Sequence, residues 1–303
     1  MLRTLRQWAG FVRFSHTVFA LPFALASMAI AARENRGWPG LKTFLLILSA
    51  MVCARTCAMA FNRIMDRKFD AANPRTALRH LPSGQITLAS AWVLCLLSAA
   101  GLIAASWFLN PLCFYLSPVA LFFACFYSLT KRFTDYTHVW LGFALALAPV
   151  GAWLAVSGGL FFSPPLGRTS GFIPLVLGAA VIFWLIGFDI IYALQDYEFD
   201  RRQKLHSLVV AWGPQNALAA AFISHLLMWG LLALFGLLCR FRVAYFSGLI
   251  FILACLLLEH WLARRRSLKW IDTAFFKLNA LVSTVFLVVT LAEVVFPGFR
   301  VMR

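Results

Sequence analysis

The chain has 303 residues and a formal net charge of +16; 62% of its residues are hydrophobic and only 13% are charged. A soluble domain is about half apolar and about a quarter charged, so this composition excludes a water-soluble globule. It also excludes a disordered chain and a small disulfide scaffold, and it leaves a polytopic membrane protein.

Nine stretches have the length of roughly 20 mostly apolar residues that a membrane-spanning helix needs. They lie at about 14–33, 42–62, 87–108, 111–131, 137–157, 172–194, 215–238, 243–263 and 273–296. Their apolar runs are continuous rather than alternating, which favours helices over barrel strands. The first stretch resembles a signal peptide, but it is long enough to span and eight more follow, so we expect an uncleaved helix. The sequence therefore predicts an all-α bundle of nine transmembrane helices.

The lysine and arginine residues between these stretches predict the orientation of the chain. The N-terminus and the loops after the second, fourth, sixth and eighth stretches carry 17 of them, and the opposite side carries 8. We therefore expect a cytoplasmic N-terminus and a C-terminus outside. The positive charge is then explained by this bias and by contact with anionic membrane lipid, and no nucleic-acid partner is expected.

We expect one transmembrane domain over residues 1–303, with two cytoplasmic segments at about 62–86 and 195–214 that carry motifs. The chain has only eleven Asp and Glu residues, and six of them fall within 66–70 and 189–200. In the first group, Asn62 and Asp66 are four residues apart and so share a helix face, and Asp70 lies one turn further along.

The second group begins inside the sixth predicted span. The spacings of 3, 4 and 4 residues place Asp189, Tyr192, Asp196 and Asp200 on one stripe of a helix. Asp66 is 130 residues from Asp196, and Asp70 is 130 residues from Asp200. Both groups lie at the predicted cytoplasmic end of a spanning helix, and basic residues follow each of them. This match is weak evidence for two half-sites that face one cavity.

These residue types favour a magnesium and diphosphate site. Carboxylate and amide oxygens are the ligands that Mg²⁺ prefers, and phosphate oxygens commonly complete its shell. Nearby Arg and Lys would neutralise the remaining charge of a diphosphate. The bland alternative is that acids at helix ends are simply solvated or paired on the surface. Two matched groups in so acid-poor a chain argue against it, and a carboxylate inside a span, such as Asp189, is costly and usually functional.

The same residues resemble the motifs of the UbiA-type intramembrane prenyltransferases. The first motif of that family is usually Asn-Asp-x-x-Asp-x-x-x-Asp, and the chain reads NRIMDRKFD from Asn62, with Arg63 in the second position. The second, YxxxDxxxD, is matched by Tyr192, Asp196 and Asp200. The segment 73–84, NPRTALRHLPSG, is similar to a family segment that often has Pro where His80 stands.

The resemblance implies transfer of a polyprenyl group from its diphosphate to an aromatic acid such as 4-hydroxybenzoate, in respiratory quinone biosynthesis at the bacterial inner membrane. It implies a Mg²⁺ cofactor and a site that faces the cytoplasm. The implied metal ligands are Asn62, Asp66, Asp70, Asp196 and Asp200. The implied diphosphate-binding residues are Arg75, Arg79, Lys131 and Lys204. Arg55 and Asn62 are expected to bind the acceptor, and Asp189 and Tyr192 join the aspartates as catalytic candidates.

Alternatives remain open. Arg63 and the segments NPRT and QDYEFDRRQKLHS are similar to a subgroup called 4-hydroxybenzoate polyprenyltransferase-like. For some members of that subgroup the resemblance implies prenylation of a dihydroxynaphthoate-type acceptor in menaquinone synthesis. A membrane transporter would also place ionisable residues in spans, but it would have them near mid-membrane. The isolated histidines His16, His138, His225 and His260 are interpreted as packing residues, whereas His80 and His206 follow the two motifs and are candidates for the phosphate region. The seven cysteines form no CxxC pair and are interpreted as packing residues.

Overall fold

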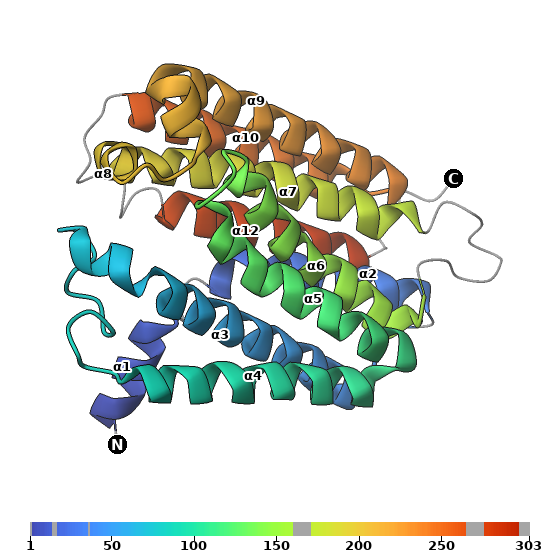
Figure 1. The fold of residues 1–303 in the computed structure, drawn as a ribbon. Helices are drawn as coiled ribbons and strands as arrows, with labels where there is room; N and C mark the ends of the chain where they lie inside the picture. Colours follow the sequence, from blue (N-terminus) through green and yellow to red (C-terminus); the bar gives the residue numbers. More distant parts are fainter. Residues whose placement is uncertain (1, 14–16, 36, 160–170, 265–275, 297–303) are drawn as a thin grey trace, which may run out of the picture.

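The computed structural model describes residues 2–13, 17–35, 37–159, 171–264 and 276–296, and within these ranges the chain forms helices and no strand. The helices are α1 (Leu2–Phe11), α2 (Thr17–Glu34), α3 (Leu41–Ala72), α4 (Leu88–Leu109), α5 (Pro111–Thr130), α6 (Thr137–Ser157), α7 (Phe172–Ala193), the 3₁₀ turn η2 (Leu194–Asp196), α8 (Tyr197–Arg202), α9 (Leu208–Leu238), α10 (Val243–Arg264) and α12 (Phe276–Val295). The long helices run side by side in one bundle (Figure 1).

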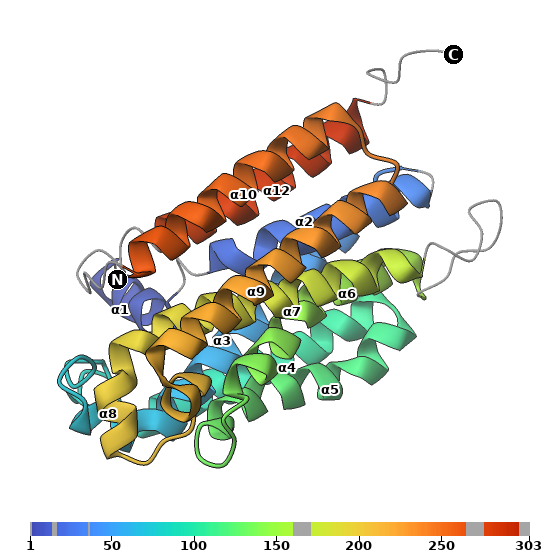
Figure 2. The same cartoon turned by 90° about the horizontal axis from the view of Figure 1, so that it is seen from above.

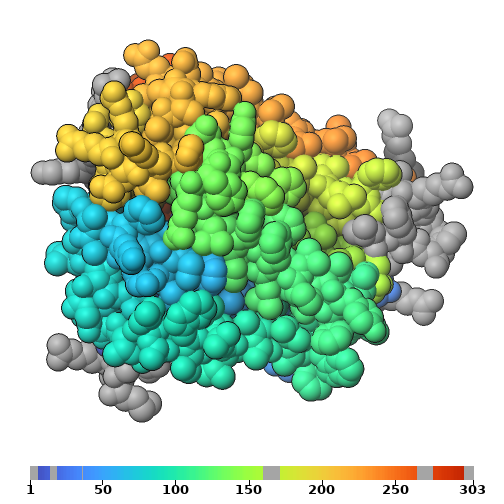
Figure 3. Space-filling model, in the orientation of Figure 1, coloured from blue at the N-terminus to red at the C-terminus, as the bar shows by residue number. Residues whose placement is uncertain are grey.

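The chain is an integral membrane protein. In the described part of the chain, eight helices are long and apolar enough to cross a membrane. They are α3, α4, α5, α6, α7 (continued through η2 and α8), α9, α10 and α12. Large apolar side chains project from them, and Leu97, Trp107, Tyr115, Leu237 and Ile250 are 63–73% exposed. Such a surface suits lipid rather than water. Figure 3 shows one outer face, to which helices of the first half of the chain contribute together with α7, α8 and α9.

The prediction of nine spans is not confirmed. Within the described residues eight helices qualify, and α2, which occupies the first predicted stretch, is not among them. Residues 14–16 of that stretch lie outside the described residues. Residues 265–275 and 297–303 do so too, and they hold some of the Lys and Arg residues from which the orientation was predicted. Orientation therefore stays a prediction.

Local sequence signals explain where several helices begin. The hydroxyl of Thr87 accepts from the backbone N–H of Ser90 and caps α4, and the side chain of Ser207 caps α9 in the same way. Asn110 caps α5, whose first residue is Pro111. These residue types satisfy N–H groups that the first turn leaves without partners, and proline has no N–H to satisfy there.

Small residues let the central helices approach closely. A Cβ atom on Gly187 of α7 would lie 2.3 Å from the ring of His225 on α9, and one on Gly142 of α6 would lie 3.0 Å from the carbonyl oxygen of Ile182. Close approach of this kind stabilises helix contacts in membranes through dispersion. The result is a core of aromatic and aliphatic residues in which α7 contacts both α6 and α9.

The two motif-bearing segments lie at the same end of the bundle. The C-terminal end of α3, the connection to α4, and α8 gather there together with α1, as two perpendicular views show (Figures 1 and 2). Helix α3 continues ten residues beyond its predicted end, so Asp66 and Asp70 are helical as expected. The second stripe is not one continuous helix, because η2 separates α7 from α8.

Candidate functional site

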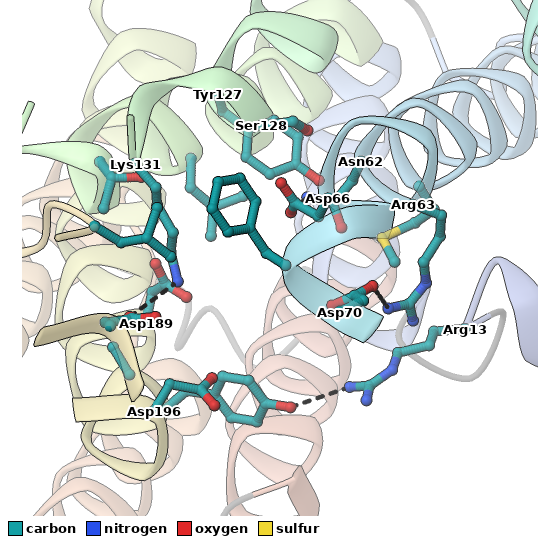
Figure 4. A pocket seen from close by; sticks show the side chains of 18 of the residues that line it. Arg13, Asn62, Arg63, Asp66, Asp70, Tyr127, Ser128, Lys131, Asp189 and Asp196 are labelled. Atoms are coloured by element: carbon teal, nitrogen blue, oxygen red, sulfur yellow. Dashed lines mark hydrogen bonds and ion pairs between the residues drawn. The ribbon is translucent and has the colours of Figure 1, made fainter. Parts of the chain in front are cut away.

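A cavity of about 260 Å³ opens between the two aspartate groups. Its walls come from α3, the end of α5, α6, α7 and the segment from η2 to α8. Ten of the twelve site residues expected from the sequence line it, namely Arg55, Asn62, Asp66, Asp70, Arg79, Lys131, Asp189, Tyr192, Asp196 and Asp200. Figure 4 shows six of them converging from both halves of the chain, namely Asn62, Asp66, Asp70, Lys131, Asp189 and Asp196.

The first aspartate group is bound to basic residues beside it. Asn62 donates to Asp66 over 2.9 Å, which confirms that the two share a helix face. Asp70 is buried, accepts from Arg79 over 2.6 Å, and lies 3.9 Å from Arg63. The Asp70 carboxylate therefore lies between two guanidinium groups.

The second group is bound by residues that follow the first. Asp196 accepts hydrogen bonds from Nε and Nη2 of Arg75, the former over 2.9 Å, and from Asn73 over 3.1 Å. Arg75 also donates to the hydroxyl of Tyr192 over 3.2 Å. Arg75 does not line the cavity itself. Its hydrogen bonds to Asp196 connect the segment that follows α3 to η2.

The electrostatics around Lys131 and Arg75 are dominated by these carboxylates. Burial alone lowers the pKa of Lys131, but the attraction of Asp200, Asp189 and other carboxylates outweighs burial and raises that pKa. The Lys131 ammonium lies 3.7 Å from Asp200. Burial likewise lowers the pKa of Arg75, but the hydrogen bonds to Asp196 and Tyr192 and the attraction of both groups together outweigh burial and raise that pKa. Both side chains are therefore fixed cations beside the cavity.

Asp189 has a partner that sequence reasoning did not assign. Nδ1 of His138, the second residue of α6, lies 2.7 Å from a carboxylate oxygen of Asp189 on α7. His138 is fully buried, whereas the Asp189 side chain is 20% exposed and lines the cavity. His138 is therefore buried, as its expected packing role requires, but it also makes a hydrogen bond to a residue that lines the cavity. No motif links the two residues, which are 51 positions apart.

Three further arginines line the cavity without having been predicted. Arg13 donates to Tyr192 over 3.2 Å, Arg63 is buried beside Asp70, and Arg132 lies 3.7 Å from Asp66. Arg63 was visible in the sequence only as a departure from a motif. Arg13 had been counted only toward the orientation of the chain, and no motif surrounds it.

Some expected residues lie elsewhere. Lys204 is exposed after α8 and does not line the cavity, so its position gives no support to a diphosphate role. His80 packs edge-on against Phe11 of α1, and His206 pairs with Asp135 over 2.9 Å. Neither histidine lines the cavity.

A second cavity of about 260 Å³ adjoins the first, and its wall is mostly apolar. Arg55, Tyr127, Leu141 and Leu145 line both cavities. The rest of the second wall is rich in alanine from α3, α5 and α6, including Ala54, Ala58, Ala120, Ala124, Ala144 and Ala148. Arg55 therefore marks the junction between a charged and an apolar compartment.

The donor set suits a magnesium ion that shares its shell with a ligand. Within the described residues, no three His, Cys, Asp or Glu side chains are grouped closely enough to hold a metal alone. However, one oxygen each of Asp70 and Asp200 is buried without a hydrogen-bond partner. Mg²⁺ is usually held by one or two carboxylates and completed by phosphate oxygens and water, so these residues fit it.

Comparison with known proteins agrees with this arrangement. The sequence matches the model of the UbiA prenyltransferase family over residues 20–281. A 4-hydroxybenzoate octaprenyltransferase of Tolumonas auensis is 30% identical over 245 residues, which are 81% of this chain and 82% of that protein.

Solved structures share the fold. The apo structure of a UbiA homolog from Aeropyrum pernix K1 is 29% identical with a TM-score of 0.80, and the match covers 92% of this chain and 98% of that one. A UbiA homolog from Archaeoglobus fulgidus bound to GPP and Mg²⁺ is 20% identical with a TM-score of 0.70, covering 95% and 99% of the two chains. At that identity the second likeness concerns the fold alone.

Proposed function

Because the chain belongs to the UbiA prenyltransferase family, we propose that it transfers a polyprenyl group from a polyprenyl diphosphate to an aromatic acid in respiratory quinone synthesis. The observation that carries this proposal is the single cavity into which aspartates of both motifs project. A relative of 30% identity that acts on 4-hydroxybenzoate makes this compound the first candidate acceptor.

We assign the diphosphate of the donor to the charged end of the cavity. Asn62, Asp66, Asp70, Asp196 and Asp200 would hold Mg²⁺. One oxygen each of Asp70 and Asp200 has no hydrogen-bond partner among the described residues and only a longer ion-pair contact, at 3.9 Å to Arg63 and 3.7 Å to Lys131. When bound, the ion supplies Lewis-acid stabilisation of the diphosphate. Arg75, Arg79 and Lys131 neutralise the charge that the diphosphate gains as the allylic C–O bond breaks and the electron pair leaves with oxygen.

The acceptor is expected at the junction of the two compartments. Arg55 is the basic residue shared by both cavities, and its Nε is buried without a hydrogen-bond partner. A carboxylate on the acceptor would satisfy that donor and fix the ring. Tyr127, which lines both cavities, and Tyr192, which lines the charged one, are aromatic residues that can stabilise an allylic cation by cation–π attraction.

The reaction is completed by the acceptor ring. A ring carbon forms the new C–C bond with the allylic carbon, and the ring then loses the proton at that carbon. Asp189 lines the cavity and is the carboxylate that we assign to accept this proton or that of the phenol. The apolar compartment between α3, α5 and α6 accommodates the first isoprene units, and a longer tail passes between helices into lipid.

We further propose that the site faces the cytoplasm at the bacterial inner membrane. Both motif segments lie at one end of the bundle, together with the N-terminal helix α1. The excess of basic residues predicted for that end supports this orientation.

The test is a direct assay with membranes that contain the full-length protein. Polyprenyl diphosphate and Mg²⁺ are incubated with 4-hydroxybenzoate or, in parallel, with a dihydroxynaphthoate, and products are identified by mass. A prenylated aromatic product supports the proposal, and the preferred acceptor distinguishes ubiquinone from menaquinone synthesis. Absence of product with every aromatic acceptor, from protein that elutes as a folded species, would overturn it.

A further inference from the structure

The two side chains of the His138–Asp189 pair differ in their exposure to the cavity. The Asp189 carboxylate faces the cavity, whereas His138 is 0% exposed behind it and does not line the cavity. Their atoms Nδ1 and Oδ2 are 2.7 Å apart. The histidine therefore cannot touch a bound substrate, and any effect that it has on the reaction passes through Asp189.

The surroundings of His138 favour one position for a ring hydrogen. Its Nε2 is buried and has no hydrogen-bond partner among the described residues. A neutral imidazole has one N–H donor and one acceptor, whereas the imidazolium has two donors. A hydrogen on Nε2 would bury an unpaired N–H group, which is costly. A hydrogen on Nδ1 avoids this cost, because it is donated to the carboxylate of Asp189.

We propose that His138 is a positioning residue, which fixes the Asp189 carboxylate so that its other oxygen is directed toward the aromatic acceptor. A carboxylate on a single side chain can otherwise rotate about its terminal torsion, whose preference is broad. One short hydrogen bond from a rigidly buried ring removes that freedom. The inference rests on the proposed function, because it concerns the acceptor of that reaction.

The chain offers an internal control of the same chemistry. His206 and Asp135 also pair through Nδ1 and a carboxylate oxygen, at 2.9 Å, but their side chains are 45% and 40% exposed and neither lines the cavity. A side-chain change at His206 therefore removes a hydrogen bond of the same type from outside the cavity, and it keeps the backbone hydrogen bond from His206 to the carbonyl of Lys131.

The experiment compares His138→Leu with His138→Asn in the full-length protein. The amide nitrogen of Asn occupies the place of Nδ1 and can still donate to Asp189, whereas Leu cannot. We expect kcat with the aromatic acceptor to fall about tenfold or more in His138→Leu, with the KM for the prenyl diphosphate within about twofold of wild type. His138→Asn should recover most of the rate, and His206→Leu should match wild type.

Folding is checked by elution in detergent and by the thermal midpoint. If His138→Leu does not fold, the comparison is made between His138→Asn and His138→Gln, whose longer side chain moves its amide away from the Nδ1 position; the former should be the faster. Equal rates of wild type and His138→Leu, or equal losses in Asn and in Leu or Gln, would overturn the positioning role. A wild-type protein without activity on any aromatic acceptor would instead overturn the proposed function.

Discussion

Arg75 and Asp196 are joined by two hydrogen bonds although 121 residues separate them. Arg75 follows the first aspartate group and Asp196 belongs to the second, so the pair connects the two halves of the cavity. Asn73 adds a third hydrogen bond to the same carboxylate. An Asp196 oxygen that ligates a metal ion must share or release these donors.

The first prediction concerns that competition. Arg75→Ala removes a cation that we assign to the diphosphate and frees Asp196 for metal. We expect the KM for the prenyl diphosphate to rise roughly 10- to 100-fold, since hydrogen bonds between charged groups contribute about 1.5–3 kcal/mol. The concentration of Mg²⁺ that gives half-maximal rate should fall. Steady-state kinetics over a Mg²⁺ titration measure both.

Arg201→Ala is the matched control, because Arg201 is an exposed arginine of α8 that does not line the cavity. It should leave both constants unchanged. A higher Mg²⁺ requirement in Arg75→Ala would show that this arginine assists the metal site instead of competing with it.

The second prediction tests the aspartates as metal ligands. Asp196→Asn keeps size and hydrogen bonding to Asn73 but removes the negative charge. Loss of a residue that only orients a metal ligand lowers metal affinity or activity by about 10–100-fold. Loss of a ligand itself should therefore lower kcat by roughly 100-fold or more. Glu198→Gln changes an exposed acid two residues away and should be silent. Comparable activity of the two variants would refute the assignment.

The third prediction uses stability as its readout. Any ligand that binds only the folded protein stabilises it, by about 2.7 kcal/mol at a concentration of 100 times Kd. Mg²⁺ with inorganic pyrophosphate should therefore raise the thermal midpoint of the purified protein, and chelation with EDTA should reverse the rise. Asp66→Asn should abolish most of the shift. A full shift in that variant would place the ions elsewhere.

The sequence predicted the parts of this site that follow from helix periodicity. Asn62 and Asp66 are four residues apart on α3, and their hydrogen bond is what that spacing implies. The presence of the long helices was also predictable, because a continuous apolar run in a membrane satisfies its backbone groups as a helix, although α3 and α9 extend beyond their predicted bounds. Asp189, Tyr192, Asp196 and Asp200, which were predicted to form one stripe, all line the cavity. They do so although η2 interrupts the helix that was expected to carry them.

Tertiary partners could not be predicted from a single chain. Nothing near His138 in the sequence indicates that it lies beside Asp189, since that contact depends on how α6 packs against α7. Arg13 approaches Tyr192 across 179 residues for the same reason. Lys204 illustrates the opposite error: it is close in sequence to the second motif but exposed in space.

The fourth prediction concerns Arg55 and the acceptor. Arg55→Ala should raise the KM for 4-hydroxybenzoate by roughly tenfold or more, the effect of losing one charge-assisted hydrogen bond. The KM for the prenyl diphosphate should change little, because Arg55 is not among the residues assigned to the diphosphate. An acceptor analogue without the carboxylate should react equally slowly with wild type and variant. A variant that discriminates between the two acceptors as wild type does would exclude this role.

The fifth prediction tests the apolar compartment. Ala148 of α6 lines only the apolar cavity, so Ala148→Leu adds three carbon atoms of bulk to its wall without touching the charged site. If the first isoprene units of the donor lie there, kcat/KM should fall, and it should fall more for donors long enough to reach Ala148 than for a dimethylallyl donor. A series of diphosphates from one to eight isoprene units measures this dependence. Ala219→Leu, at an exposed position of α9, is the control and should preserve the wild-type profile. Identical profiles for Ala148→Leu and wild type would mean that the tail takes another path, since close-packed walls cannot absorb a leucine beside a bound chain without cost.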